Sequence, residues 1–125
     1  MTVFVQERRR HPRLINNVPL KLSSENADVV TETKNLSCNG AYCRINKYLE
    51  PMTKLKIQLL LPFKSKAKVT TKKVSCQGVI VRSESIPGAQ YFDIAIYFND
   101  IQQKDLNCLN DYINTLLDSG TVSQG

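Results

Sequence analysis

The stretch QYFDIAIYF, residues 90–98, decides the fold of this chain together with the segment that follows it. Every second residue from 92 to 98 is Phe or Ile, and smaller or more polar side chains stand between them. This alternation is typical of a strand with one buried face. In residues 101–117 the period changes, and apolar residues recur every three to four positions. That spacing predicts an amphipathic helix of roughly four turns.

Five earlier segments carry strand patterns, and turn signals separate them. The expected strands are residues 18–22, 27–34, 40–45, 54–61 and 66–83, the last with a bulge or bend at Gly78. Hairpin-scale connections favour a small barrel or a sandwich, and the helix stripe needs a surface to cover. We predict a mainly β fold: a small six-stranded antiparallel β-barrel with a C-terminal α-helix packed against it. The expected parts are a flexible basic N-terminal arm (1–17), the barrel with its helix (18–118) and a flexible tail (119–125).

The charge of the chain is concentrated in two clusters. The net charge is +6 over 125 residues, which is a length that suits one domain. One cluster is Arg8, Arg9, Arg10 and Arg13, and the other is Lys64, Lys66, Lys68, Lys72 and Lys73. The excess favours an anionic partner without choosing among a nucleotide, a nucleic acid and a membrane surface. The lysines alternate along an expected strand and loop, and we interpret them as solvated side chains.

Several classes of protein are disfavoured by what the sequence contains. No apolar run approaches the roughly 20 residues of a membrane-spanning helix, and no signal peptide is visible at the start. We therefore expect a cytoplasmic protein without membrane insertion. The four cysteines form no CxxC pair and there is one histidine, which disfavours a zinc site and indicates free thiols. No nucleophile–base pair or phosphate-binding loop is found, so we expect no enzyme, no catalytic residue and no metal.

Two short motifs carry the chemistry of the chain. The first is Glu7-Arg8-Arg9-Arg10-His11-Pro12-Arg13, and the second is Asn35-Leu36-Ser37-Cys38-Asn39-Gly40. Arginine offers five fixed donors that match phosphates and the Hoogsteen edge of guanine. Asparagine and serine add neutral donors and acceptors, and glycine lets a ligand approach the backbone closely. Together the motifs indicate a site for an anionic, guanine-like ligand.

In their order and interval, these motifs resemble the PilZ family of bacterial cyclic di-GMP receptors. Arg9 and Arg13 match the family's R-x-x-x-R, and Asn35, Ser37 and Gly40 match its (D/N)-x-S-x-x-G. The resemblance spans roughly residues 6–117. Each motif alone is weak, but both in order on a β-rich body are fairly specific. Asn35 stands where the family more often has Asp, and a neutral acceptor binds more weakly than a charged one.

The resemblance implies a stand-alone receptor that binds cyclic di-GMP between the N-terminal arm and the barrel loop. The implied ligand-binding residues are Arg8, Arg9, Arg13, Asn35, Ser37 and Gly40. Arg8, directly before R-x-x-x-R, implies binding of a stacked, intercalated ligand dimer. Gly40 is expected to keep the wall of the site thin and to adopt a positive φ. Binding would order the arm and change the surface presented to a protein partner; no cofactor other than this ligand is implied.

Other interpretations stay open. A small basic β-barrel that binds RNA or single-stranded DNA would also be positively charged, although we expect no nucleic acid here because few aromatic residues are available for stacking. A PilZ-like adaptor without ligand is a further alternative. Tyr42 and Arg44 follow the second motif on one strand face, and they either line the site or lie on the barrel exterior. The downstream process, the identity of the partner and the oligomeric state are not determined by the sequence.

Overall fold

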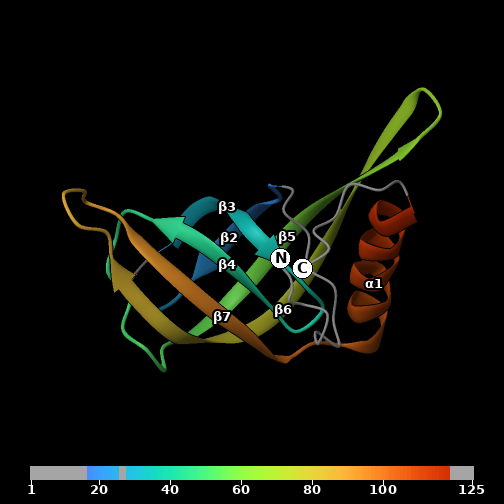
Figure 1. Cartoon of the computed structure of the whole chain (residues 1–125). Helices are drawn as coiled ribbons and strands as arrows, with labels where there is room; N and C mark the ends of the chain where they lie inside the picture. The colour runs from blue at the N-terminus through green and yellow to red at the C-terminus, as the bar shows by residue number, and fades with distance from the viewer. Residues whose placement is uncertain (1–16, 26–27, 119–125) are drawn as a thin grey trace.

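The computed structural model describes residues 17–25 and 28–118. In this part of the chain, six antiparallel strands close into a barrel in the order β2-β3-β4-β7-β6-β5, and one helix follows (Figure 1). The elements are β2 (Pro19–Ser23), β3 (Asp28–Leu36), β4 (Gly40–Ile45), β5 (Lys54–Ser65), β6 (Lys68–Ser85), β7 (Phe92–Asp100) and α1 (Gln103–Asp118). The predicted fold class is confirmed, including the closed barrel and the C-terminal helix.

The interior of the barrel is built from the alternating apolar residues that the sequence pattern selected. On β5, the side chains of Leu55, Ile57, Leu59 and Leu61 are at most 3% exposed. On β7, Ile94 and Ile96 are buried, whereas Tyr97, the residue after Ile96, is exposed and faces outward. Because successive side chains of a strand point to opposite faces, one face of every strand fills the core and the other meets solvent.

The bulge expected at Gly78 is present. The register between β6 and β7 shifts between Gln77 and Gly78, and it shifts again between Ile80 and Arg82. A β-bulge bends its strand and increases the local twist, which helps a sheet to close on itself. The long strand β6 can therefore pair with β5 along its first part and with β7 along its second part.

Strand β5 is longer than predicted, and β6 has the predicted length but lies two residues further along the chain. They pair without interruption from Lys54↔Val79 to Ser65↔Lys68, and Lys66 turns the chain with a φ of 52°. The sequence pattern ended the first of these strands at Leu61, because Pro62 and the lysines beyond it interrupt the apolar alternation. In the structure, pairing with β6 continues β5 to Ser65 instead. The hairpin that the two strands form projects beyond the barrel (Figure 1).

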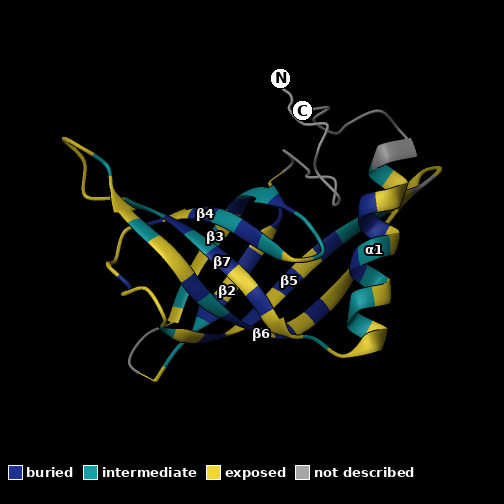
Figure 2. Ribbon diagram, turned by 60° about the horizontal axis from the view of Figure 1, so that its bottom comes forward, coloured by how far each residue is buried: buried dark blue, intermediate teal, exposed yellow. Residues whose placement is uncertain are grey.

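The helix α1 lies at one end of the barrel, beside the projecting part of the β5–β6 hairpin (Figures 1 and 2). It buries Leu109, Tyr112 and Ile113, and it contacts β6 and β5. The ring of Tyr112 meets that of Phe63 edge to face, with 5.5 Å between the centroids. The apolar face of α1 thus packs against the hairpin, and the burial of this face was expected from the helical spacing of its apolar residues. No helix in the described part of the chain is both long and apolar enough to cross a membrane.

Candidate functional site

The second motif forms the tight connection between β3 and β4. The Ser37 backbone N–H donates to the Gly40 carbonyl at 2.9 Å, and the Asn39 backbone N–H donates to the Ser37 hydroxyl at 3.2 Å. Serine and asparagine favour such turns because their side chains can bond the nearby backbone. The turn therefore fixes the Ser37 hydroxyl, and the hydroxyl keeps acceptor capacity toward a ligand.

Gly40 is required by a close approach between two strands. A β-carbon on Gly40 would overlap the carbonyl oxygen of Ile96, which belongs to the neighbouring strand β7. The carbonyl of the preceding turn residue, Asn39, accepts a hydrogen bond from the Phe98 backbone N–H at 2.8 Å and holds the turn against β7. The expectation that Gly40 adopts a positive φ is wrong: among the described glycines, only Gly88 does. Steric space, and not backbone conformation, selects glycine here.

An open hollow of about 450 Å³ lies on the outer surface of the barrel at this turn, over β4, β6 and β7. Asn35, Ser37 and Gly40 all line it, so the structure brings the three described residues of the predicted site together. The remaining lining residues are Leu36, Asn39, Ala41, Tyr42, Val81, Arg82, Ala95, Ile96 and Tyr97. The hollow combines amide, hydroxyl, phenol and guanidinium groups over an apolar floor.

Two β-bulges turn polar side chains into this hollow. On β3, Thr33 is buried, and regular alternation would direct Asn35 to the same inner face. A register shift between Thr33 and Asn35 reverses the faces, so that Leu36 is buried and Asn35 lines the hollow. On β6, Ile80 is buried, and regular alternation would also direct Arg82 inward. The register shift between these two residues turns Arg82 outward, where it is exposed and pairs with Ala95 of β7.

Arg82 and Tyr97 are residues of the hollow that sequence reasoning missed. Tyr97 is 51% exposed, and the alternation of residues 90–98 already indicated that it faces outward. The alternation of residues 66–83 placed the Arg82 side chain on the buried face. The one indication against burial was the residue type, because an unpaired arginine is almost never fully buried. Arg82 is exposed and forms no ion pair with any residue that the structure describes.

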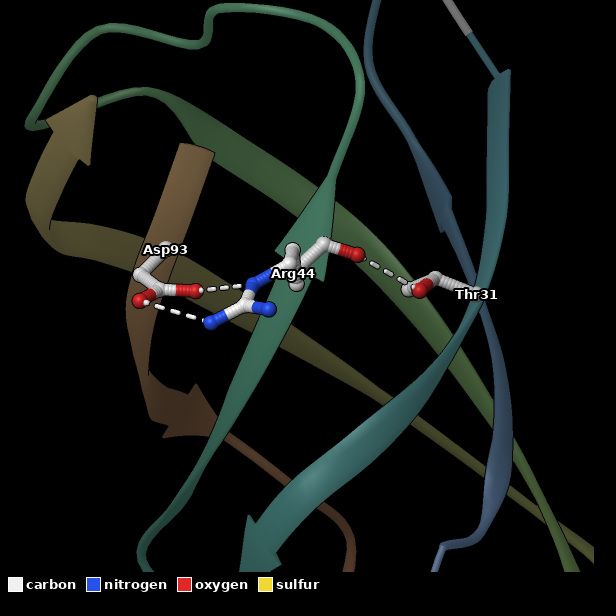
Figure 3. A network of polar contacts seen from close by, with 3 residues as sticks. All are labelled: Thr31, Arg44 and Asp93. Atoms are coloured by element: carbon white, nitrogen blue, oxygen red, sulfur yellow. Dashed lines mark hydrogen bonds and ion pairs between the residues drawn. The ribbon is translucent and has the colours of Figure 1, made fainter. Parts of the chain in front are cut away.

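Arg44 lies outside the hollow, although its strand neighbour Tyr42 lines it. Its guanidinium donates to both carboxylate oxygens of Asp93, from Nε at 2.9 Å and from a terminal nitrogen at 3.4 Å (Figure 3). Its carbonyl accepts from the Thr31 hydroxyl at 2.7 Å. The hydrogen bond from Arg44 lowers the pKa of Asp93, and the same bond raises the pKa of Arg44. Of the two residues that the sequence left open, Tyr42 belongs to the hollow and Arg44 fastens β4 to β7.

The predicted arm joins the barrel close to the hollow. Arg8, Arg9 and Arg13 lie outside the described residues, but Val18 is described. The Val18 backbone N–H donates to the Thr33 hydroxyl at 3.0 Å, and the Thr33 N–H donates to the Val18 carbonyl at 2.9 Å. Val18 is thus held beside Thr33, which lies two residues before Asn35 on β3.

The cysteines are thiols, and none of the four is in a disulfide. Burial raises the pKa of Cys43 and of Cys76 to about 12, which keeps both thiols protonated. Burial also raises the pKa of Cys38 in the β3–β4 turn and of Cys108 on α1, and both are half-buried. Over residues 17–25 and 28–118, no three histidine, cysteine or acidic residues are grouped so that they could hold a metal ion.

One family model matches most of the chain, and solved structures share its fold. A PilZ domain model matches residues 7–115. Among solved structures, the inhibitor of motility from Bacillus subtilis (MotI/DgrA) superposes with a TM-score of 0.72 and 17% identity over 90% of this chain and 52% of that one. This chain thus spans about half of that protein's length. The PilZ domain of YcgR from Escherichia coli with c-di-GMP superposes with a TM-score of 0.61 and 12% identity, over 91% of this chain and 95% of that one. No curated protein sequence matches.

Proposed function

The chain belongs to the PilZ domain family, and on this premise we propose that it is a receptor that binds cyclic di-GMP in the hollow beside Gly40. PilZ domains are regulatory binding domains rather than enzymes, and the similar YcgR domain was solved with c-di-GMP. The observation that carries the proposal is the convergence of Asn35, Ser37 and Gly40 on one open hollow, which Arg82 also lines.

The side chains of the hollow match the two chemical parts of this ligand. A guanine presents donors on its Watson–Crick edge, and the Asn35 side chain can accept from them through its carbonyl oxygen. The Ser37 hydroxyl is held by the turn and can bond a base or a phosphate. The Arg82 guanidinium suits a phosphate or the O6 and N7 atoms of guanine, because its donors are fixed in a plane. The apolar floor supplies contact for a base face.

The arginines of the first motif can reach the hollow from where the arm joins. Arg13 precedes Val18 by five residues, a stretch that spans at most about 17 Å when extended. Thr33 is the hydrogen-bond partner of Val18, and Asn35 lies two residues further along β3. The distance along the strand from Thr33 to Asn35 is about 7 Å. In our proposal Arg9 and Arg13 therefore close over the bound ligand and contact its guanines and phosphates. Ordering of the arm would then change the surface that a partner protein meets.

Arg8 extends this proposal to the number of ligands bound. A second cyclic di-GMP, stacked on the first, would bring two more phosphates near the arm. Arg8 could neutralise part of that charge and stack its guanidinium plane on a guanine. The stoichiometry of binding therefore distinguishes a single ligand from an intercalated pair.

Isothermal titration calorimetry tests the proposal directly. The full chain is titrated with cyclic di-GMP at physiological salt, with GTP and cyclic di-AMP as controls for selectivity. Saturable binding of cyclic di-GMP that exceeds both controls supports the receptor. A stoichiometry near two ligands per chain supports the role of Arg8, and a value near one excludes it.

Matched variants locate the binding at the hollow. Asn35→Ala and Arg13→Ala should weaken binding strongly, whereas Asn114→Ala on the exposed face of α1 should not. A folded protein without measurable affinity for cyclic di-GMP would overturn the proposal. If the Asn35→Ala variant binds as tightly as the wild type, the ligand binds at another place on the chain.

A further inference from the structure

One hairpin of the barrel carries a large excess of positive charge. Residues 54–83, which span β5 and most of β6, contain seven lysines, one arginine and no acidic residue. Their formal charge is therefore +8, which exceeds the +6 of the whole chain. A solvated protein surface ordinarily intersperses both signs of charge. The separation of charge onto one hairpin thus sets this element apart from the rest of the barrel.

Part of this hairpin stands free of the barrel. On the side of β5, strand β2 pairs only with residues 56–59, and on the side of β6, strand β7 pairs only from Gln77 onward. Among the strands that the structure describes, residues 60–65 and 68–73 consequently pair only with each other, as a two-stranded ribbon. This ribbon is the projecting element beside α1 in Figure 1.

The two faces of the ribbon differ. One face meets the helix: Phe63 packs against Tyr112, and the Lys72 ammonium lies 4.6 Å from the centre of the Phe63 ring. The opposite, outer face carries the directly paired residues Leu60↔Lys73, Pro62↔Thr71 and Lys64↔Val69. Leu60 is 42% exposed and Val69 is 57% exposed, and both lysines are exposed. Each apolar side chain of the outer face thus has either a lysine or a threonine across from it.

Simpler roles do not account for this outer face. Lysines protect free strand edges from pairing with other chains, but that role does not require exposed Leu60 and Val69 between them. Binding of single-stranded nucleic acid relies on aromatic side chains that stack on bases. The outer face has none, and the nearby Phe63 is covered by Lys72 and Tyr112. Protein interfaces combine an apolar core with a polar rim, and charges on one partner face opposite charges on the other. The outer face offers both features, with Leu60 and Val69 beside Lys73 and Lys64.

We propose that the outer face of the ribbon is a docking surface for an acidic, amphipathic segment of a partner protein. Carboxylates of that segment would pair with Lys64 and Lys73, and its apolar side chains would cover Leu60 and Val69. Lys66 and Lys68 at the tip of the ribbon would speed the encounter through long-range attraction. This surface does not include the hollow at Gly40, and the proposal does not depend on the binding of cyclic di-GMP.

The test uses the full chain without cyclic di-GMP and a displayed library of random short peptides. Peptides selected on the wild type are then measured by fluorescence anisotropy against two ribbon variants, Lys64→Glu with Lys73→Glu and Leu60→Ser with Val69→Ser. The control, Lys21→Glu with Lys47→Glu, changes the net charge equally at exposed positions outside the ribbon. Thermal unfolding of each variant establishes that it is folded.

We expect selection of peptides that combine Asp or Glu with apolar residues. Both ribbon variants should bind them about tenfold more weakly or worse, because like charges across an interface repel and the apolar contact is lost. The control variant should retain wild-type affinity. The proposal is overturned if acidic peptides are not enriched, or if the ribbon variants bind like the wild type. It is also overturned if duplex DNA or phosphatidylserine vesicles bind the ribbon more tightly than the best peptide.

Discussion

Asn35 and Arg82 line the same hollow because each follows a β-bulge in its own strand. The two residues lie on β3 and β6, which are not neighbours in the barrel, and β4 and β7 separate them. Without the register shifts, alternation would direct both side chains into an apolar core. Bulges are known to re-aim side chains next to functional sites. The same device, used twice, therefore builds a polar hollow on the outside of a barrel whose core stays apolar.

Arg82→Ala should weaken the binding of cyclic di-GMP by about tenfold or more, because a charge-assisted hydrogen bond contributes about 1.5–3 kcal/mol. The melting temperature should change little, since Arg82 is exposed. Calorimetric titration measures the affinity. Arg44→Ala is the matched control, because Arg44 is engaged with Asp93 and lies outside the hollow. Equal losses in the two variants would contradict a direct role for Arg82.

Thr33→Val should destabilise the fold by about 1–3 kcal/mol. Thr33 is the single fully buried polar side chain among the described residues, and its hydroxyl accepts the Val18 backbone N–H at 3.0 Å. Valine keeps the volume but leaves that N–H without its partner, and a buried unsatisfied donor costs about this much. Denaturant unfolding measures the difference. Thr71→Val on the exposed ribbon should have an effect close to zero.

Gly40→Ala should be strongly destabilising, because its β-carbon would collide with the Ile96 carbonyl and separate β4 from β7. Gly88→Ala provides the comparison: Gly88 has a φ of 76° but nothing within 4 Å of an added β-carbon. There we expect a loss of only about 1 kcal/mol, from the left-handed conformation alone. Thermal unfolding of both variants shows which costs more stability, the steric collision at residue 40 or the left-handed backbone at residue 88. A Gly40→Ala variant as stable as Gly88→Ala would refute the steric argument.

Asp93→Asn should lower stability at neutral pH but not in acid. The pKa of Asp93 is lowered in the folded protein by the hydrogen bond from Arg44. A lowered pKa stabilises the fold above the usual carboxyl pKa of 3.8, and this stabilisation is lost as the pH falls through the folded value. The melting temperatures of wild type and variant should therefore converge below that pH.

Arg44→Gln should remove the same pH-dependent stability, since both residues form one pair. The double variant should then lose no more than either single variant. If the two single losses add instead, the stabilisation does not come from the contact between Arg44 and Asp93.

Cyclic di-GMP should slow the alkylation of Cys38 and leave that of Cys108 unchanged. Both thiols are half-buried, whereas Cys43 and Cys76 are buried with pKa values of about 12 and should resist the reagent. Only the thiolate reacts, so the rates should rise with pH. Cys38 stands in the turn that borders the hollow, and Cys108 lies on α1. Mass spectrometry after iodoacetamide treatment follows each site; equal protection of both thiols would argue against binding at the turn.

Most of the fold followed from periodicity. The alternation in each strand and the change of period after residue 100 predicted six strands and a helix, both of which the structure contains. The short connections left a barrel or a sandwich open, and the barrel that we predicted is confirmed. The motif residues Asn35, Ser37 and Gly40 were selected from their spacing together with the resemblance to the PilZ family, and all three line one hollow. The length of the β5–β6 hairpin was not predicted, because the pairing across it overrides the interrupted apolar pattern at Pro62.

By itself, the sequence determined which face of a strand is buried wherever the alternation runs without a bulge, since apolar side chains must leave water wherever the chain folds. It also determined the family, because membership depends on the identity and spacing of residues. Only the tertiary structure decided that Asn35 and Arg82 share a hollow, that Arg44 is engaged by Asp93, and that Gly40 is needed for space. These facts depend on strand register, and register is set by pairing between segments that are distant along the chain.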